Sequence, residues 1–217
     1  MNGADTNPVR PSRIYPGLPP FGSGQRIGLY GGSFNPPHGG HRQIALIALH
    51  RLKLDAIWWL VTPGNPLKEN DGLEAPAGRM EAAARLAAHP RMVVSGLETR
   101  LNTRFTADMA EKLTRRVKTV RFVWLMGSDN LAGFHCWDRW RDIADHFPIA
   151  VINRPGSLTA PLNAPAAQAL ARYRIEESAG SILAECRPPA WIFITGPRTS
   201  ASSTGLRNAA TGPRKES

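Results

Sequence analysis

Short apolar runs alternate along the chain with longer segments in which apolar residues recur at helical spacing. Most of the runs are apolar at both alternating positions, which is typical of strands covered on both faces of a sheet. Each run is four to six residues long. The runs are Ile27–Tyr30, Ala56–Val61, Met92–Ser95, Arg121–Met126, Pro148–Ile152 and Ala190–Thr195.

The segments between these runs have the 3.6-residue period of helices. In the first of them, apolar residues fall at positions 44, 47, 48 and 52. The predicted helices cover residues 39–53, 76–88, 105–117, 138–146 and 165–177. Strand–helix alternation predicts a doubly wound α/β domain, with a mostly parallel sheet and helices on both of its faces.

The two ends of the chain lack this pattern. Residues 1–25 contain five prolines and four glycines, so we predict a disordered leader there. Residues 208–217 are predicted to form a C-terminal tail, which leaves one domain over residues 26–207. Residues 155–168 are rich in proline and alanine and are predicted to be a surface excursion.

Composition narrows the class of protein. The 217 residues include only two cysteines, which excludes a disulfide framework. No apolar run approaches the roughly 18 residues of a membrane span, and the N-terminus has no apolar signal-peptide core. We therefore expect a cytoplasmic protein without a membrane association.

The chain is strongly basic, with 27 Lys and Arg against 17 Asp and Glu, a net charge of +10. Such an excess first suggests a polyanionic partner such as nucleic acid. Residues 100–121 alone hold seven cationic and two acidic side chains, a local excess of +5. Phe105 is the one aromatic residue in this stretch, so it does not resemble a stacking platform for single strands. We interpret it as a solvated helix face.

The segment from Gly31 to His41, Gly-Gly-Ser-Phe-Asn-Pro-Pro-His-Gly-Gly-His, follows the first strand and opens a helix. Phosphates bind at this kind of junction, and glycines let the backbone approach them closely. His38 and His41 are three residues apart, so both imidazoles can face one anion. Neither the P-loop motif nor the dinucleotide-binding fingerprint is present. A zinc site is not expected, because no third ligand lies nearby.

This segment resembles the HxGH signature of the nucleotidyltransferase superfamily, and in its longer form bacterial nicotinate-nucleotide (nicotinic acid mononucleotide) adenylyltransferases. Three further segments are similar to that family's motifs and occur in the same order, so the resemblance covers residues 27–207. The chain departs from the family where Phe105 replaces a tyrosine and where little sequence follows Arg207. The matching segments are 103–109, 127–131 continued by Phe134, Trp137 and Trp140, and 202–207.

The resemblance implies transfer of the adenylyl group of ATP to nicotinate mononucleotide, giving deamido-NAD and pyrophosphate, with Mg²⁺ accompanying ATP. The nucleophile is already a phosphate oxygen, so catalysis should rest on alignment and charge neutralisation. Two alternatives keep the reaction but change the acceptor, to nicotinamide mononucleotide or phosphopantetheine. An alternative of another class is a basic nucleic-acid-binding protein, although the motifs argue against nucleic acid as a partner.

The expected catalytic residues are His38, His41 and Arg207, with the histidines on the ATP phosphates and Arg207 on the leaving pyrophosphate. Ser203 and Thr204 would donate to the β- and γ-phosphates, although an ordinary helix cap is the alternative. The full set expected to bind ATP is Gly31, Gly32, Ser33, Phe34, His38, His41, Gly127, Asp129, Arg154, Ser203, Thr204 and Arg207.

The mononucleotide is expected to contact Asn35, Lys68, Thr106 and Trp137. Trp137 would stack on the pyridine ring, since a planar cationic ring suits an indole face, and core packing is its alternative. Thr106 would bind the pyridine carboxylate. Lys68 would meet a phosphate, unless it is a solvated loop lysine. Trp140 is expected in the core, and no side-chain metal site is predicted.

Overall fold

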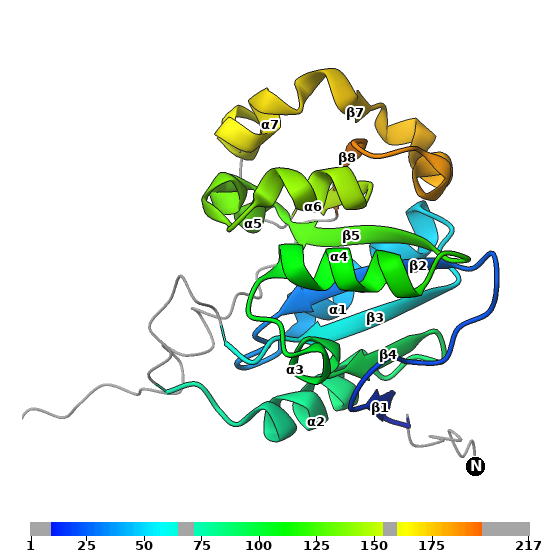
Figure 1. Ribbon diagram of the computed structural model, residues 1–217, viewed down its shortest axis with the longest axis vertical. Helices are drawn as coiled ribbons and strands as arrows, with labels where there is room; N and C mark the ends of the chain where they lie inside the picture. The colour runs from blue at the N-terminus through cyan, green and yellow to red at the C-terminus, as the bar shows by residue number, and fades with distance from the viewer. Residues whose placement is uncertain (1–9, 65–71, 154–159, 197–217) are drawn as a thin grey trace, which may run out of the picture.

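In the computed structural model, which describes residues 10–64, 72–153 and 160–196, eight strands form one sheet in the order β1-β4-β3-β2-β5-β6-β8-β7 (Figure 1). Every neighbouring pair is parallel. The strands are β1 (Arg13–Tyr15), β2 (Arg26–Gly32), β3 (Ala56–Val61), β4 (Met92–Ser95), β5 (Arg121–Gly127), β6 (Ile149–Ile152), β7 (Arg174–Ile175) and β8 (Trp191–Ile194).

Seven α-helices and four 3₁₀ helices are described around the sheet. Within the described ranges, no helix is both long enough and apolar enough to cross a membrane. The α-helices are α1 (Gly39–Arg51), α2 (Pro76–Ala87), α3 (Leu97–Leu101), α4 (Thr106–Arg116), α5 (Ser128–Gly133), α6 (Trp140–His146) and α7 (Pro165–Ala169). The 3₁₀ helices are η1 (Phe134–Cys136), η2 (Ala160–Asn163), η3 (Ala171–Tyr173) and η4 (Glu177–Glu185).

The helices cover both faces of the sheet. One apolar cluster joins a face of the sheet to α1, α2 and η4, and a second joins the opposite face to α3, α4, α5, α6 and α7. Figure 1 shows the corresponding layers, with α4 in front of the strands and α1 behind them. Strands β3, β6 and β8 are buried almost throughout, as their unbroken apolar runs predict.

The predicted doubly wound parallel fold is confirmed. All six predicted strands are present, and β3 and β4 have the predicted bounds. The chain runs from β2 outward through β3 to β4, and later from β5 outward through β6. The order therefore reverses between β2 and β5, and in open α/β sheets ligands bind in the crevice beyond the carboxyl ends at such a point.

The predicted disordered leader is wrong for residues 10–25. Residues Arg13 to Tyr15 form β1, which pairs with β4 at the edge of the sheet. The segment is held further by Ser12, whose N–H donates to the Ala84 carbonyl at 2.9 Å, and by a 2.7 Å bond from Ser95 Oγ to the Gly17 carbonyl. A segment of three residues is too short to show the alternating pattern of a strand, so its extended structure depends on pairing with β4.

The predicted helix at 165–177 is also wrong in its second half. Helix α7 ends at Ala169, and Arg174 and Ile175 form β7, which pairs with β8. The expected surface excursion at 155–168 is wrong at its end, because Ala166 and Ala167 are buried in the core. The helix ends early because Arg174 and Ile175 pair with β8. Ala166 and Ala167 are buried because their small side chains fit into the core.

Candidate active site

The carboxyl end of β2 packs closely against its surroundings. A side chain at Gly31 would place a Cβ 2.6 Å from Cη2 of Trp124, and one at Gly32 would come within 3.1 Å of the Phe34 ring. Phe34 has a positive φ of 48° and is 2 % exposed, with its ring stacked on Trp59. The Phe34 side chain therefore faces the core, so any contact of this residue with ATP has to come from its backbone.

His38 and His41 form a capping box at the start of α1. Gly40 N donates to His38 Nδ1 at 3.2 Å, and His38 N donates to His41 Nδ1 at 3.1 Å. Because each Nδ1 accepts a hydrogen, the neutral ring carries its proton on Nε2. Each ring therefore has a donor of the polarity that a phosphate requires, and Nε2 of His38 is itself buried.

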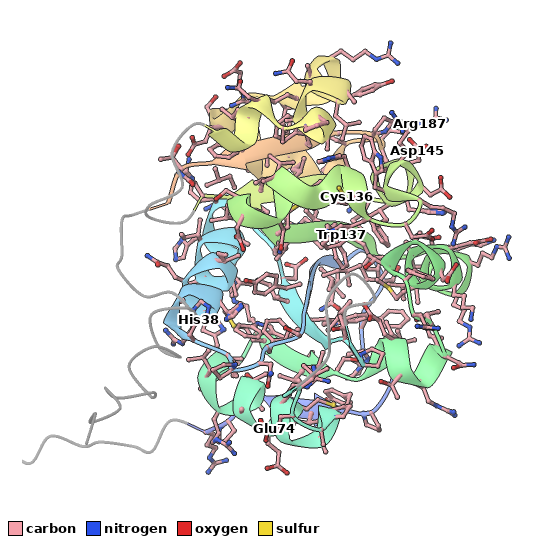
Figure 2. The ribbon with its side chains drawn as sticks, turned by 90° about the vertical axis from the view of Figure 1, so that its left-hand side faces the viewer. His38, Glu74, Cys136, Trp137, Asp145 and Arg187 are labelled. Atoms are coloured by element: carbon pink, nitrogen blue, oxygen red, sulfur yellow. The ribbon has the colours of Figure 1, made fainter. Side chains whose placement is uncertain are left out.

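The imidazoles lie against each other and on an aromatic wall. Their centroids are 3.9 Å apart, and His41 also packs edge-on against Phe34 at 5.1 Å. His38 is only 3 % exposed. This packing restricts both rings, and in Figure 2 His38 lies at the start of α1. The structure therefore brings together the two histidines that the sequence analysis selected.

The carboxyl end of β5 lies beside that of β2. Gly127 caps α5, and Asp129 is exposed in the first turn of this helix. Ser128 is fully buried and donates from Oγ to Asn153 Oδ1 at 3.1 Å, at the end of the neighbouring strand β6. The structure thus places Gly127 and Asp129 at the reversal point, on the other side from the histidine loop.

Trp137 and Trp140 have different environments. Trp140 is 8 % exposed and belongs to the core, as predicted. Trp137 is half-buried and packs edge-on against Trp124 and Phe134, with centroids 6.4 and 5.4 Å away. Figure 2 labels Trp137 on the segment that follows α5. Core packing is thus part of its role, and its partial exposure is compatible with stacking.

Of the other residues predicted to bind the substrates, Thr106 and Asn35 lie within the described ranges. Thr106 opens α4 directly after Phe105. The Asn35 side chain contacts the other side of the loop that follows β3, donating to the Gly72 carbonyl at 3.2 Å and accepting from Glu74 N at 3.4 Å. Five predicted residues lie outside the described ranges: Lys68, Arg154, Ser203, Thr204 and Arg207.

Three polar residues beside this site were not predicted from the sequence: Ser128, Asn153 and Arg79. Arg79 had a recognisable signal, because it shares a face of α2 with the buried Ala83 and Ala87 at intervals of four. A charged residue on the apolar face of a helix requires polar partners. Ser128 and Asn153 had no such signal, since their contact depends on the pairing of β5 with β6.

Comparisons with known proteins identify the family of this chain. The cytidylyltransferase-like family model matches residues 29–209. A "Probable nicotinate-nucleotide adenylyltransferase" of Bradyrhizobium sp. (strain ORS 278) is 58 % identical over 183 residues, covering 84 % of this chain and 95 % of the relative. One of Brucella suis is 51 % identical over 181 residues, covering 83 % and 93 %.

A solved structure shares the fold. The Plasmodium falciparum nicotinic acid mononucleotide adenylyltransferase complexed with NaAD superimposes with a TM-score of 0.61 at 16 % identity, covering 87 % of this chain and 85 % of the other. At this identity the likeness concerns the fold alone. The family model and the close relatives go further: the chain belongs to the cytidylyltransferase-like family, among the nicotinate-nucleotide adenylyltransferases.

Proposed function

We propose that the protein transfers the adenylyl group of ATP to nicotinate mononucleotide and releases pyrophosphate and deamido-NAD. The observation that carries the proposal is the pair of histidines at the start of α1, the helix that follows β2 at the reversal point of the sheet. Two relatives that are named for this activity align with this chain over nearly the whole of their own length. The family and the site thus support the same reaction.

The reaction needs charge stabilisation rather than proton abstraction. A phosphate oxygen of the mononucleotide attacks the α-phosphorus of ATP and forms the new P–O bond. The bond from the α-phosphorus to the bridging oxygen breaks, and its electron pair leaves with pyrophosphate. Negative charge grows on the oxygens around the α-phosphorus and on the leaving group, where the His38 and His41 N–H donors would stabilise it.

We propose Mg²⁺ as the cation that accompanies ATP. In the described ranges, no three His, Cys, Asp or Glu side chains gather as a ligand set. Mg²⁺ usually binds through one or two carboxylates, phosphates and water, so this site suits a cation brought by the nucleotide. When bound, it would neutralise phosphate charge, and Asp129 is the exposed carboxylate at the reversal point that could hold it.

The mononucleotide would bind between the histidines, the start of α4 and the segment that follows α5. Trp137 would offer an indole face to the pyridine ring, and Thr106 would donate to its carboxylate from the first turn of α4. Asn35 would contribute through the loop that it fixes. We further propose phosphate contacts for Lys68, Ser203, Thr204 and Arg207, and an adenine contact for Arg154.

Incubation of the purified protein with MgATP and nicotinate mononucleotide tests the proposal. Pyrophosphate and a dinucleotide should appear in equal amounts, and neither should form when the mononucleotide is omitted. Absence of pyrophosphate with a folded protein would refute the activity. Removal of Mg²⁺ with EDTA should abolish turnover.

The acceptor is identified by comparing kcat/KM for nicotinate mononucleotide, nicotinamide mononucleotide and phosphopantetheine. A site built to hydrogen-bond a carboxylate leaves polar groups unpaired when the acceptor lacks it, so the nicotinate form should be preferred. A higher kcat/KM for either other acceptor would keep the adenylyl transfer and change the substrate.

A further inference from the structure

Arg79 is a charged residue without exposure to solvent. It lies in α2 and is 0 % exposed. Burial lowers its pKa from the ordinary value, while the Glu74 carboxylate opposes that change. An arginine in such a position needs its donors satisfied, because unpaired buried charge is strongly unfavourable.

The guanidinium is satisfied by backbone carbonyls. Nη1 donates to Ser33 O at 2.6 Å and to Thr62 O at 2.9 Å, Nη2 donates to Pro63 O at 3.3 Å, and Nε donates to Glu74 O at 2.7 Å. Four of the five N–H donors are therefore used. These carbonyls come from the loop after β2, the loop after β3 and the segment before α2, so one side chain joins three segments.

These bonds also set the direction of backbone amides. In a trans peptide, the C=O and the following N–H point to opposite sides. The carbonyl of Ser33 points at Arg79, so the N–H of Phe34 points away from it. The same holds for Pro63 and the N–H of Gly64. A second tie, from Asn35 to Gly72 and Glu74, keeps the same segments together.

We propose that Arg79 is a positioning residue, which holds the loops after β2 and β3 so that the backbone amides of Phe34 and Gly64 face the phosphates of the substrates. It touches no substrate itself. The inference rests on the proposed function, since it takes phosphate-bearing substrates as the ligands. It accounts for a buried arginine whose four hydrogen bonds described above go to main-chain oxygens beside the site.

Kinetics of Arg79→Lys and Arg79→Met test this role against a purely structural one. A displacement of about 1 Å can cost on the order of 10² in rate, so Arg79→Lys should lower kcat at saturating substrate at least tenfold, and Arg79→Met more. Arg85→Lys, on the exposed side of the same helix, is the matched control. Ala83→Gly is a second control, which weakens α2 without touching the loops.

The proposal requires that Ala83→Gly lower Tm but keep kcat and KM, whereas Arg79→Lys lowers kcat in folded protein. Equal kcat for Arg79→Lys and Arg85→Lys, or an equal kcat loss in Ala83→Gly, would overturn it. An inactive wild-type protein would instead contradict the proposed function.

A measurement on the wild type does not depend on the folding of any variant. In ¹⁵N-labelled protein, addition of ATP or of nicotinate mononucleotide should shift the amide resonances of Phe34 and Gly64. The amide of Ala83, in α2 and outside the loops, serves as the reference. If neither Phe34 nor Gly64 responds to either ligand while the enzyme is active, the positioning role is excluded.

Discussion

The imidazoles of His38 and His41 cap α1, and they are also predicted to donate hydrogen bonds to a bound phosphate. Each Nδ1 accepts a main-chain N–H, so the ring is held by the start of the helix that it caps. A phosphate bound to the Nε2 side would then meet donors whose orientation is already fixed. Preorganised donors stabilise developing charge more than mobile ones do.

Replacing His41 by alanine should affect catalysis and stability separately. Loss of one oriented donor should lower kcat by about 10²-fold or more. Loss of the cap should reduce the free energy of unfolding by about 0.5–2 kcal/mol. His50→Ala, at the exposed end of the same helix, should change neither by a comparable amount. Steady-state kinetics with urea unfolding measures both, and an unchanged kcat in His41→Ala would exclude the phosphate role.

Glu98 is a second buried group with a physical consequence. Its side chain is 3 % exposed at the start of α3, and burial raises the pKa of its carboxyl from 4.5 to about 8. The folded protein keeps this proton up to about pH 8, whereas the unfolded chain releases it near 4.5. Unfolding between these values releases a proton, so rising pH favours the unfolded chain, by up to about 1.4 kcal/mol per pH unit.

The variant Glu98→Gln should remove this part of the pH dependence. Near pH 5 it should match the wild type, because an amide replaces a protonated acid of similar shape. Towards pH 8 it should become increasingly more stable than the wild type. Urea unfolding at pH 5, 6, 7 and 8 measures the difference, with the exposed Glu81→Gln on α2 as the control. Parallel pH profiles for Glu98→Gln and the wild type would contradict the expectation.

At the scale of elements, the carboxyl end of β2 depends on the absence of a side chain at Gly31. The added methyl group of Gly31→Ala would overlap the ring of Trp124, a buried residue of the neighbouring strand β5. Overpacking of this kind costs about 1–3 kcal/mol. In contrast, Gly133→Ala has open space around the new atom and should change stability by less than about 0.5 kcal/mol. Chemical denaturation compares the stabilities of the two variants, and equal stabilities would show that the surroundings of Gly31 adapt to the new methyl group.

Elements that carry their own pattern were predictable from the sequence. β3 and β4 are apolar runs with polar ends, and α1 has both a periodic apolar face and a recognisable start. β1 and α3 have three and five residues, too few to establish a period. Both elements form because of tertiary contacts: β1 pairs with β4, and Leu97 of α3 packs into the core.

The site was predictable to the extent that it is local in sequence. His38 and His41 are close in the chain, and their helix start fixes their geometry. The contacts of Arg79 join main-chain oxygens from distant segments. Any residue offers a carbonyl, so those partners could not be recognised by residue type.

At the scale of the molecule, the +5 excess at 100–121 does not form a surface of one sign. Arg115 pairs with Glu111 at 2.7 Å, and Arg121 pairs with Glu185 at 2.8 Å. Lys112 donates to the Leu101 carbonyl at 2.9 Å. From α6 and the residues before it, Asp138, Arg139 and Asp142 add further charges beside Asp108. The predicted solvated helix face is therefore a mixed network of both signs.

Deletion of residues 1–24 should destabilise the whole molecule. The deletion removes β1 and the contact of Phe21 with Trp58, and it exposes the edge of β4. An uncovered strand edge promotes association between chains. The truncated protein should therefore show a lower Tm than the full chain and concentration-dependent light scattering. An unchanged Tm and a monodisperse solution would indicate that β1 contributes little.

The parallel pairing of β1 with β4 also determines when this part of the chain can fold. The bond between Ser95 and Gly17 joins residues that are 78 positions apart in the chain. Parallel pairs with long loops form slowly, because the entropy of closure is lost before contacts compensate for it. During synthesis, β1 emerges before every other strand of the described sheet, yet it has no partner until β4 has left the ribosome. This edge of the sheet is therefore assembled late, although its sequence is made first.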